Sequence, residues 1–179
     1  MIYTEMTPNP NALKFVTGQT LLATGSKDYP SREEAQASPL AQALFELAGV
    51  TGVFIAQDFI TVSKDEGTPW EQLTPSITQT IEHAIAAGKI LAEGTSTGPS
   101  STTSGDIENK IRAILDNEIR PAVAMDGGDV VFYGYENGIV KLHLQGACSS
   151  CPSSIMTLKA GVENRLRMEV PEIKEVIQV

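Results

Sequence analysis

Hydrophobic residues recur every three or four positions between Ile107 and Ile119, which predicts an amphipathic helix in the last third of the chain. We expect this helix to stop at Pro121, because the residue before a proline is disfavoured in a helix. Asn137-Gly138 marks a hairpin turn between two runs of β-forming residues. The predicted elements are a helix over 107–119, strands over 130–135 and 139–145, a helix over 155–166 and a strand over 173–179. Their order is α-β-β-α-β.

The first half of the chain shows a similar mixture of patterns. Ser38 is placed to cap a helix with Pro39 at its first position, and Gly49 is placed to end it. A second helix starts near Pro69, with apolar residues at intervals of four. The predicted elements are strands over 2–6 and 13–16, a helix over 39–48, strands over 50–56 and 59–63, and the helix from Pro69. The order β-β-α-β-β-α predicts one helical layer on an antiparallel sheet.

Residues 94–105 consist of Gly, Thr, Ser and Pro with no apolar periodicity, which is typical of a flexible linker. The linker predicts an N-terminal domain over residues 1–93 and a C-terminal domain over residues 106–179. The expected fold class is therefore α+β, with two small α/β-sandwich domains joined by a flexible linker.

Charge and hydropathy exclude several classes of function. The formal net charge is −9, so the chain lacks the cations that neutralise nucleic-acid phosphates. No apolar run approaches the length that a membrane span needs. Neither a signal peptide nor an organelle presequence is visible at the N-terminus. We expect no nucleic-acid or membrane partner, and a cytoplasmic location in a bacterium, or the mitochondrial matrix if the chain is a mature processed form.

The chain has two cysteines, Cys148 and Cys151, placed between a predicted strand and a predicted helix. The N-terminal end of a helix favours thiolate, which is the form that binds metals and attacks disulfides. Cysteines that merely fill space are less expected, because serine neighbours and Gly146 argue against an apolar pocket. A metal-binding or a redox function follows.

Antiparallel pairing of the predicted hairpin should bring the turn at residues 126–129, Asp-Gly-Gly-Asp, close to Cys148. The two glycines have two interpretations. They can expose backbone N–H groups toward sulfur, or they can form a tight turn that needs positive φ.

Three kinds of chemistry suit the cysteine pair. A thiol–disulfide oxidoreductase also carries Cys-x-x-Cys at a helix start, although a tight hairpin is not its usual context. A structural zinc site needs four ligands, and a zinc-bridged dimer could supply them. Of the two histidines, His83 lies in the other predicted domain, and His143 is expected to be a solvated strand residue. An iron–sulfur cluster normally takes four thiolates, which two chains together provide.

Two segments of the C-terminal domain, Met125–Val130 and Leu144–Ser154, resemble the signature of the NifU C-terminal (Nfu) domain. Residues 7–15, Thr-Pro-Asn-Pro-Asn-Ala-Leu-Lys-Phe, resemble the Nfu N-terminal domain, as do residues 38–41 and 59–62. The resemblance covers the chain apart from the linker.

The resemblance implies a non-enzymatic iron–sulfur cluster scaffold or carrier. Matched residue by residue, it implies that Cys148 and Cys151 ligate a [4Fe–4S] cluster, with [2Fe–2S] as the alternative, and that there is no catalytic residue. It implies a homodimer bridged by the cluster, with apo-proteins as clients and an upstream assembly scaffold as a partner. The N-terminal domain has no cysteine, so partner binding or regulation is its expected role.

Overall fold

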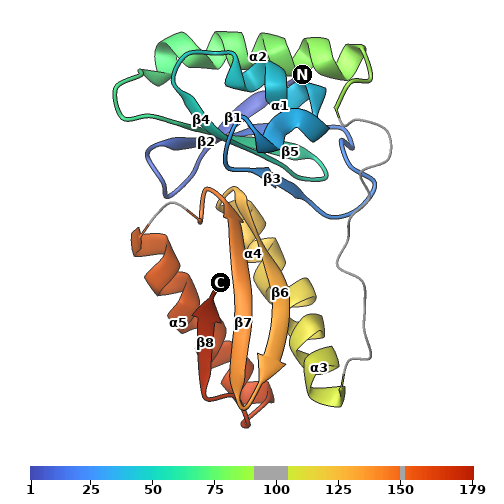
Figure 1. Cartoon of the computed structure of the whole chain (residues 1–179), viewed down its shortest axis with the longest axis vertical. Helices are drawn as coiled ribbons and strands as arrows, with labels where there is room; N and C mark the ends of the chain where they lie inside the picture. Colours follow the sequence, from blue (N-terminus) through green and yellow to red (C-terminus); the bar gives the residue numbers. More distant parts are fainter. Residues whose placement is uncertain (91–104, 150–151) are drawn as a thin grey trace. The chain divides into compact units, whose positions relative to one another are not determined.

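The computed structural model describes residues 1–90, 105–149 and 152–179, with only the backbone described at 152–154. The chain divides into two compact units, Met1–Gly98 and Pro99–Val179 (Figure 1). The predicted linker, residues 94–105, lies outside the described residues except for Gly105. The linker and the domain limits drawn from it therefore stay predictions.

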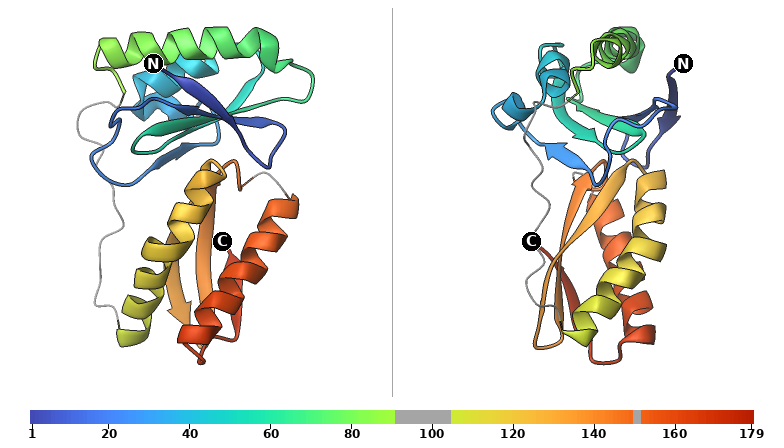
Figure 2. Two further views of the ribbon diagram at one scale, coloured as in Figure 1. Left: turned by 180° about the vertical axis from the view of Figure 1, so that it is seen from behind. Right: turned by 90° about the vertical axis from the view of Figure 1, so that its right-hand side faces the viewer.

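The first unit is a five-stranded antiparallel sheet in the order β1-β2-β5-β4-β3. Two α-helices cover one face of this sheet, as the right-hand view of Figure 2 shows, and a short 3₁₀ helix precedes them. The elements are β1 (Tyr3–Met6), β2 (Ala12–Val16), β3 (Lys27–Tyr29), the 3₁₀ helix (Glu34–Ala37), α1 (Pro39–Phe45), β4 (Val50–Ile55), β5 (Phe59–Lys64) and α2 (Trp70–Ala86).

Helix packing onto the sheet forms the core of the first unit. Ser38 caps α1 as predicted, because its hydroxyl accepts a hydrogen bond from the Ala41 N–H at 3.1 Å. Leu73, Ile77 and Ile81 of α2 are buried in the core, which confirms the predicted apolar stripe. The sequence pattern missed β3, a strand of three residues at the sheet edge, and α1 ends at Phe45 instead of reaching residue 48.

The second unit is a three-stranded sheet in the order β6-β7-β8, with its helices on one face (Figure 2). Strands β6 and β7 are antiparallel, while β8 runs parallel to β7 through the crossover helix α5. The elements are α3 (Asp106–Ile114), a π-helical turn (Leu115–Ile119), α4 (Arg120–Met125), β6 (Gly128–Glu136), β7 (Ile139–Gly146), α5 (Pro152–Glu169) and β8 (Glu175–Gln178). Both units confirm the α+β class.

The β6–β7 hairpin follows the predicted pattern closely. Asn137 and Gly138 have φ angles of 52° and 86°, as a two-residue type I′ turn requires. Along β7, buried and half-exposed residues alternate, with Val140, Leu142 and Leu144 in the core. Because Gly128 pairs with Gly146, the hairpin places the turn before β6 at the same end of the sheet as the cysteine motif after β7.

The prediction that the first helix of this unit stops at Pro121 is wrong. The helical path continues through Pro121 to Met125, after the π-helical turn at Leu115–Ile119. A proline ring normally clashes with the carbonyl four residues earlier and leaves it without its N–H partner. The wider π turn relieves this conflict. Arg120 is thereby carried to the edge of β6.

No helix in the described part of the chain is long and apolar enough to cross a membrane.

Candidate functional site

The cysteine motif connects the end of β7 at Gly146 to the start of α5 at Pro152, as the sequence predicted. Cys148 lies in the described part of this connection, whereas Cys151 lies outside the described residues. The structure therefore tests the surroundings of Cys148 only, and the assignment of both cysteines as ligands stays a prediction.

The glycine turn lies directly against Cys148, which confirms the proximity predicted from the hairpin. Gly128 pairs with Gly146 at the end of the ladder, and the Ala147 N–H donates to the Gly127 carbonyl at 3.2 Å. A Cβ atom on Gly128 would lie 2.6 Å from the Gln145 carbonyl oxygen and 2.9 Å from the Cys148 Sγ. Gly128 therefore has no room for a side chain. Gly127 has a φ of 81°, as expected for a tight turn.

The side chain of Cys148 is buried, with 3% of its surface exposed, and it belongs to the hydrophobic core of the second unit. The expectation that no apolar pocket would receive a cysteine here is therefore wrong for Cys148. The reason is the missing side chain at Gly128, because the space that a Cβ would occupy is taken by the cysteine sulfur.

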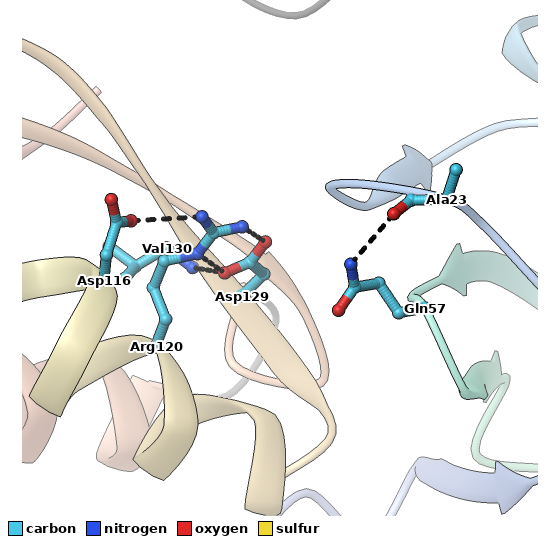
Figure 3. A network of polar contacts seen from close by, with 6 residues as sticks. All are labelled: Ala23, Gln57, Asp116, Arg120, Asp129 and Val130. Atoms are coloured by element: carbon cyan, nitrogen blue, oxygen red, sulfur yellow. Dashed lines mark hydrogen bonds and ion pairs between the residues drawn. The ribbon is translucent and has the colours of Figure 1, made fainter. Parts of the chain in front are cut away.

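Asp129 follows this glycine and forms a bidentate ion pair with Arg120 (Figure 3). The Nε and one terminal nitrogen of Arg120 donate to the two carboxylate oxygens at 2.9 and 2.8 Å. The Oδ1 atom also accepts a hydrogen bond from the Val130 N–H at 2.8 Å. Asp129 is only 7% exposed, whereas the side chain of its partner Arg120 is partly exposed.

The pKa of Arg120 is raised above its ordinary value, chiefly by the hydrogen bonds to Asp129 and further by Asp116. Arg120 is therefore charged under all ordinary conditions. No pattern in the sequence indicates this pair. Its members are nine residues apart on a helix and a strand, and no periodicity links them.

His143 lies on the half-exposed face of β7, as expected of a solvated strand residue. Its Nδ1 atom lies 2.7 Å from the Val179 carbonyl oxygen, and its ring centroid lies 5.7 Å from that of Tyr133. Within the described ranges, no three histidine, cysteine, aspartate or glutamate side chains are grouped to hold a metal ion. Nothing in these ranges supplies the four ligands of an intrachain zinc site.

The second distinctive motif, at the start of the first unit, forms a closed polar loop. Thr7 Oγ1 donates to the carbonyls of Asn9 and Ala12, each at 2.9 Å, while Asn9 Oδ1 accepts from the Asn11 N–H at 3.0 Å. The indole N–H of Trp70, the first residue of α2, donates to the Pro10 carbonyl at 3.1 Å. This loop joins β1 to β2, is hydrogen-bonded to the start of α2, and has no cysteine, histidine, aspartate or glutamate of its own.

Two family models match the chain. The model described as "Scaffold protein Nfu/NifU N terminal" matches residues 2–88, and the "NifU-like domain" model matches residues 111–177. A solved NifU-like protein from Saccharomyces cerevisiae is 30% identical, with a TM-score of 0.47, over 52% of this chain and 85% of its own.

Two named relatives match 99% of this chain. The NFU1 iron–sulfur cluster scaffold homolog, mitochondrial, of Drosophila ananassae is 49% identical, and this chain covers 64% of that protein's length. Its counterpart in Homo sapiens is 46% identical, with 71% of its length covered. The chain belongs to the NFU1 family of iron–sulfur cluster scaffold proteins.

Proposed function

We propose that this protein binds a [4Fe–4S] cluster between two chains through Cys148 and Cys151 and passes it to apo-proteins. The observation that carries the proposal is the position of Cys148, the first cysteine of a Cys-x-x-Cys motif, against a glycine turn in a chain of the NFU1 family. No catalytic residue is needed for this function, because the cluster is cargo.

The stoichiometry follows from counting thiolates. The chain has two cysteines, and a cluster of this kind takes four. One cluster per two chains satisfies the count without other ligands, and a [2Fe–2S] cluster would be shared in the same way. The bridging cluster then contributes free energy to the association of the two chains.

Transfer to a client follows from ligand exchange. A thiol of the apo-protein loses its proton and binds iron, while Cys148 or Cys151 leaves the iron and takes up a proton. Four exchanges move the cluster without a change of oxidation state. Bonds made and broken are both iron–thiolate bonds, so the equilibrium is set by how well each protein holds the cluster.

Burial of Cys148 argues against a thiol–disulfide oxidoreductase that attacks through this cysteine. Thiols that attack disulfides lie in partly exposed, electropositive surroundings. Cys148 packs instead in the core, behind Gly128. As a ligand of a cluster shared between two chains, Cys148 would have to turn its sulfur to the surface, so its burial describes the cluster-free chain.

The remaining assignments are proposals of the same kind. Residues 1–93 form a domain that binds partners or regulates transfer, residues 94–105 form the linker, and residues 106–179 bind the cluster. The partners are apo-proteins and an upstream assembly scaffold. Both named relatives are mitochondrial proteins, and for this chain we propose the mitochondrial matrix or the bacterial cytoplasm.

Anaerobic reconstitution of the full chain with iron and sulfide tests the proposal. We expect one [4Fe–4S] cluster per two chains by iron and sulfide analysis, and a cluster-dependent dimer by analytical ultracentrifugation. Cys148→Ser and Cys151→Ser should each abolish stable binding, because a serine hydroxyl is a poor iron ligand beside a thiolate. Ser149→Ala, a similar small change in the same connection, should bind normally.

Far-UV circular dichroism should show an unchanged fold in each variant. Since Cys148 is buried, the Cys151→Ser variant carries the test if Cys148→Ser unfolds. Stoichiometric zinc without sulfide, dithiol turnover without metal, or a monomer that holds a full cluster would each contradict the proposal.

A further inference from the structure

The Arg120–Asp129 ion pair joins the helical layer of the second unit to the turn that contacts Cys148. Both carboxylate oxygens of Asp129 accept hydrogen bonds from the guanidinium, and Oδ1 also accepts one from the Val130 N–H (Figure 3). The carboxylate is thus tied at once to α4 and to the start of β6.

The guanidinium of Arg120 is itself held on two sides. Its second terminal nitrogen donates to Asp116 Oδ1 at 3.1 Å. Asp116 lies in the π-helical turn that precedes Arg120. A planar guanidinium with both ends bonded has few alternative positions, so Arg120 acts as a fixed point for Asp129.

The path from Asp129 to Cys148 is short and made of backbone. Asp129 is bonded covalently to Gly128, which pairs with Gly146 and leaves no room for a Cβ beside the Cys148 sulfur. Gly127 accepts a hydrogen bond from the Ala147 N–H, which immediately precedes Cys148. A displacement of Asp129 therefore moves both glycines relative to Cys148.

We propose that Arg120 is a positioning residue for the cluster-binding connection. Acting through Asp129, it keeps the Gly127–Gly128 turn against Cys148 and so controls the access of solvent and ligands to the cysteine sulfur. The inference rests on the proposed function in one respect only, that Cys148 is a ligand of the cargo.

The test measures Cys148 in the full, cluster-free chain. A Cys151→Ser background leaves Cys148 as the single thiol, and iodoacetamide reports its exposure under native conditions. In Arg120→Gln we expect alkylation to be about tenfold faster, since charged hydrogen bonds that favour the closed turn are lost. Hydrogen exchange of the Ala147 amide should accelerate with it, while amides in the middle of the β6–β7 hairpin keep their protection.

Arg165 provides a matched control in the same unit. It binds Glu118 through two hydrogen bonds of 2.5 and 2.7 Å and also contacts Glu169, but these residues lie on the helices and not next to the glycine turn. Arg165→Gln should leave the alkylation of Cys148 at the rate of the parent chain.

Two further variants separate positioning from a general loss of stability. Arg120→Lys keeps the charge but loses the bidentate geometry, so its alkylation rate should lie between those of the parent and Arg120→Gln. Combining Arg120→Gln with Asp129→Asn should change the rate no more than Asp129→Asn does alone, because both act through one contact. If Arg120→Gln does not fold, Arg120→Lys carries the measurement.

An unchanged alkylation rate and unchanged Ala147 exchange in the Arg120 variants would overturn the inference. An equal acceleration in Arg165→Gln would overturn it as well, since the effect would then be a general loosening of the unit. These rates are measured without iron, so a failure to bind a cluster would contradict the proposed function and leave them unaffected.

Discussion

The two most distinctive loops of this chain, residues 7–11 in the first unit and residues 126–129 in the second, are built in similar ways but differ in what they contact. Each includes a buried polar side chain, Asn9 at the centre of the first with 5% and Asp129 at the end of the second with 7% of its surface exposed. Asn9 bonds within its own loop, whereas Asp129 is held by an arginine from a helix. The second of the two loops adjoins Cys148, whereas the sequence of the first unit contains no cysteine.

This difference shows that the residues of a distinctive motif can serve to stabilise the fold as well as to form a functional site. The loop at residues 7–11 joins β1 to β2 and is hydrogen-bonded to α2, and these contacts need the side chains of Thr7 and Trp70. The loop at residues 126–129 satisfies comparable constraints and also sets the position of a potential ligand. Substitutions in each loop separate the two roles.

The largest effect is expected for Gly128→Ala. The new Cβ would lie 2.6 Å from a backbone carbonyl oxygen and 2.9 Å from the Cys148 sulfur. The backbone cannot move away easily from the new Cβ. We therefore expect the second unit to lose about 3 kcal/mol of stability, and its unfolding temperature in calorimetry of the full chain to fall. Cluster binding should also be lost.

Gly134→Ala is the control, since it lies on the same strand and a Cβ there meets nothing within 4 Å. Calorimetry of this variant should show a transition close to that of the parent. If Gly128→Ala and Gly134→Ala are equally stable, the glycine turn does not press against Cys148 in the way described.

A smaller effect, confined to the first unit, is expected for Asn9→Ala. The change removes the acceptor of the Asn11 N–H in a buried loop, and we expect it to cost about 1–2 kcal/mol. Fluorescence of Trp70, the single tryptophan, should follow this loss during denaturant unfolding. Cluster binding by Cys148 and Cys151 should be unchanged.

Asn11→Ala makes the same chemical change two residues later, at a side chain for which the structure describes no hydrogen bond. It should unfold at nearly the denaturant concentration of the parent. A loss of cluster binding in Asn9→Ala with the second unit still folded would contradict the purely architectural role of residues 7–11.

Local sequence patterns were enough to predict most of the fold. The apolar stripe of α2 and the Asn137-Gly138 turn act within a few residues, so periodicity and turn propensity reveal them. Strand β3 was not predicted, because three residues are too few to show a strand pattern. They form a strand through their pairing with β4. The helical path through Pro121 was not predicted, because the π turn that permits it depends on packing.

The candidate site was predictable in part for the same reason. Hairpin pairing placed the glycine turn beside Cys148, because antiparallel register follows from the turn. The burial of Cys148 depends on the space beside Gly128, and the Arg120–Asp129 contact depends on how far the helix carries Arg120. Both are properties of tertiary geometry, and neither leaves a periodic signal.

The smallest predicted effect concerns Glu118, whose exposed carboxylate pairs with Arg165, in contrast to the buried carboxylate of Asp129 that pairs with Arg120. The pKa of Glu118 is lowered from its ordinary value of 4.5, chiefly by the hydrogen bonds from Arg165. A lowered pKa in the folded state means that the pair stabilises the fold above the ordinary value and that this contribution is lost as the pH falls through the lowered pKa.

Glu118→Gln removes the titrating carboxylate and keeps an acceptor of similar shape. Thermal unfolding between about pH 3 and about pH 7 should therefore show the parent slightly more stable than Glu118→Gln near neutral pH, with the gap closing in acid. Added salt should narrow the gap, because both partners are partly exposed to solvent. Glu172→Gln, at an exposed residue for which the structure describes no ion pair, should show a smaller gap at neutral pH. If the gap for Glu118→Gln stays constant down to the lowest pH, the charge of Glu118 contributes nothing to stability. The contrast with the Arg120–Asp129 pair would then rest on Asp129 alone.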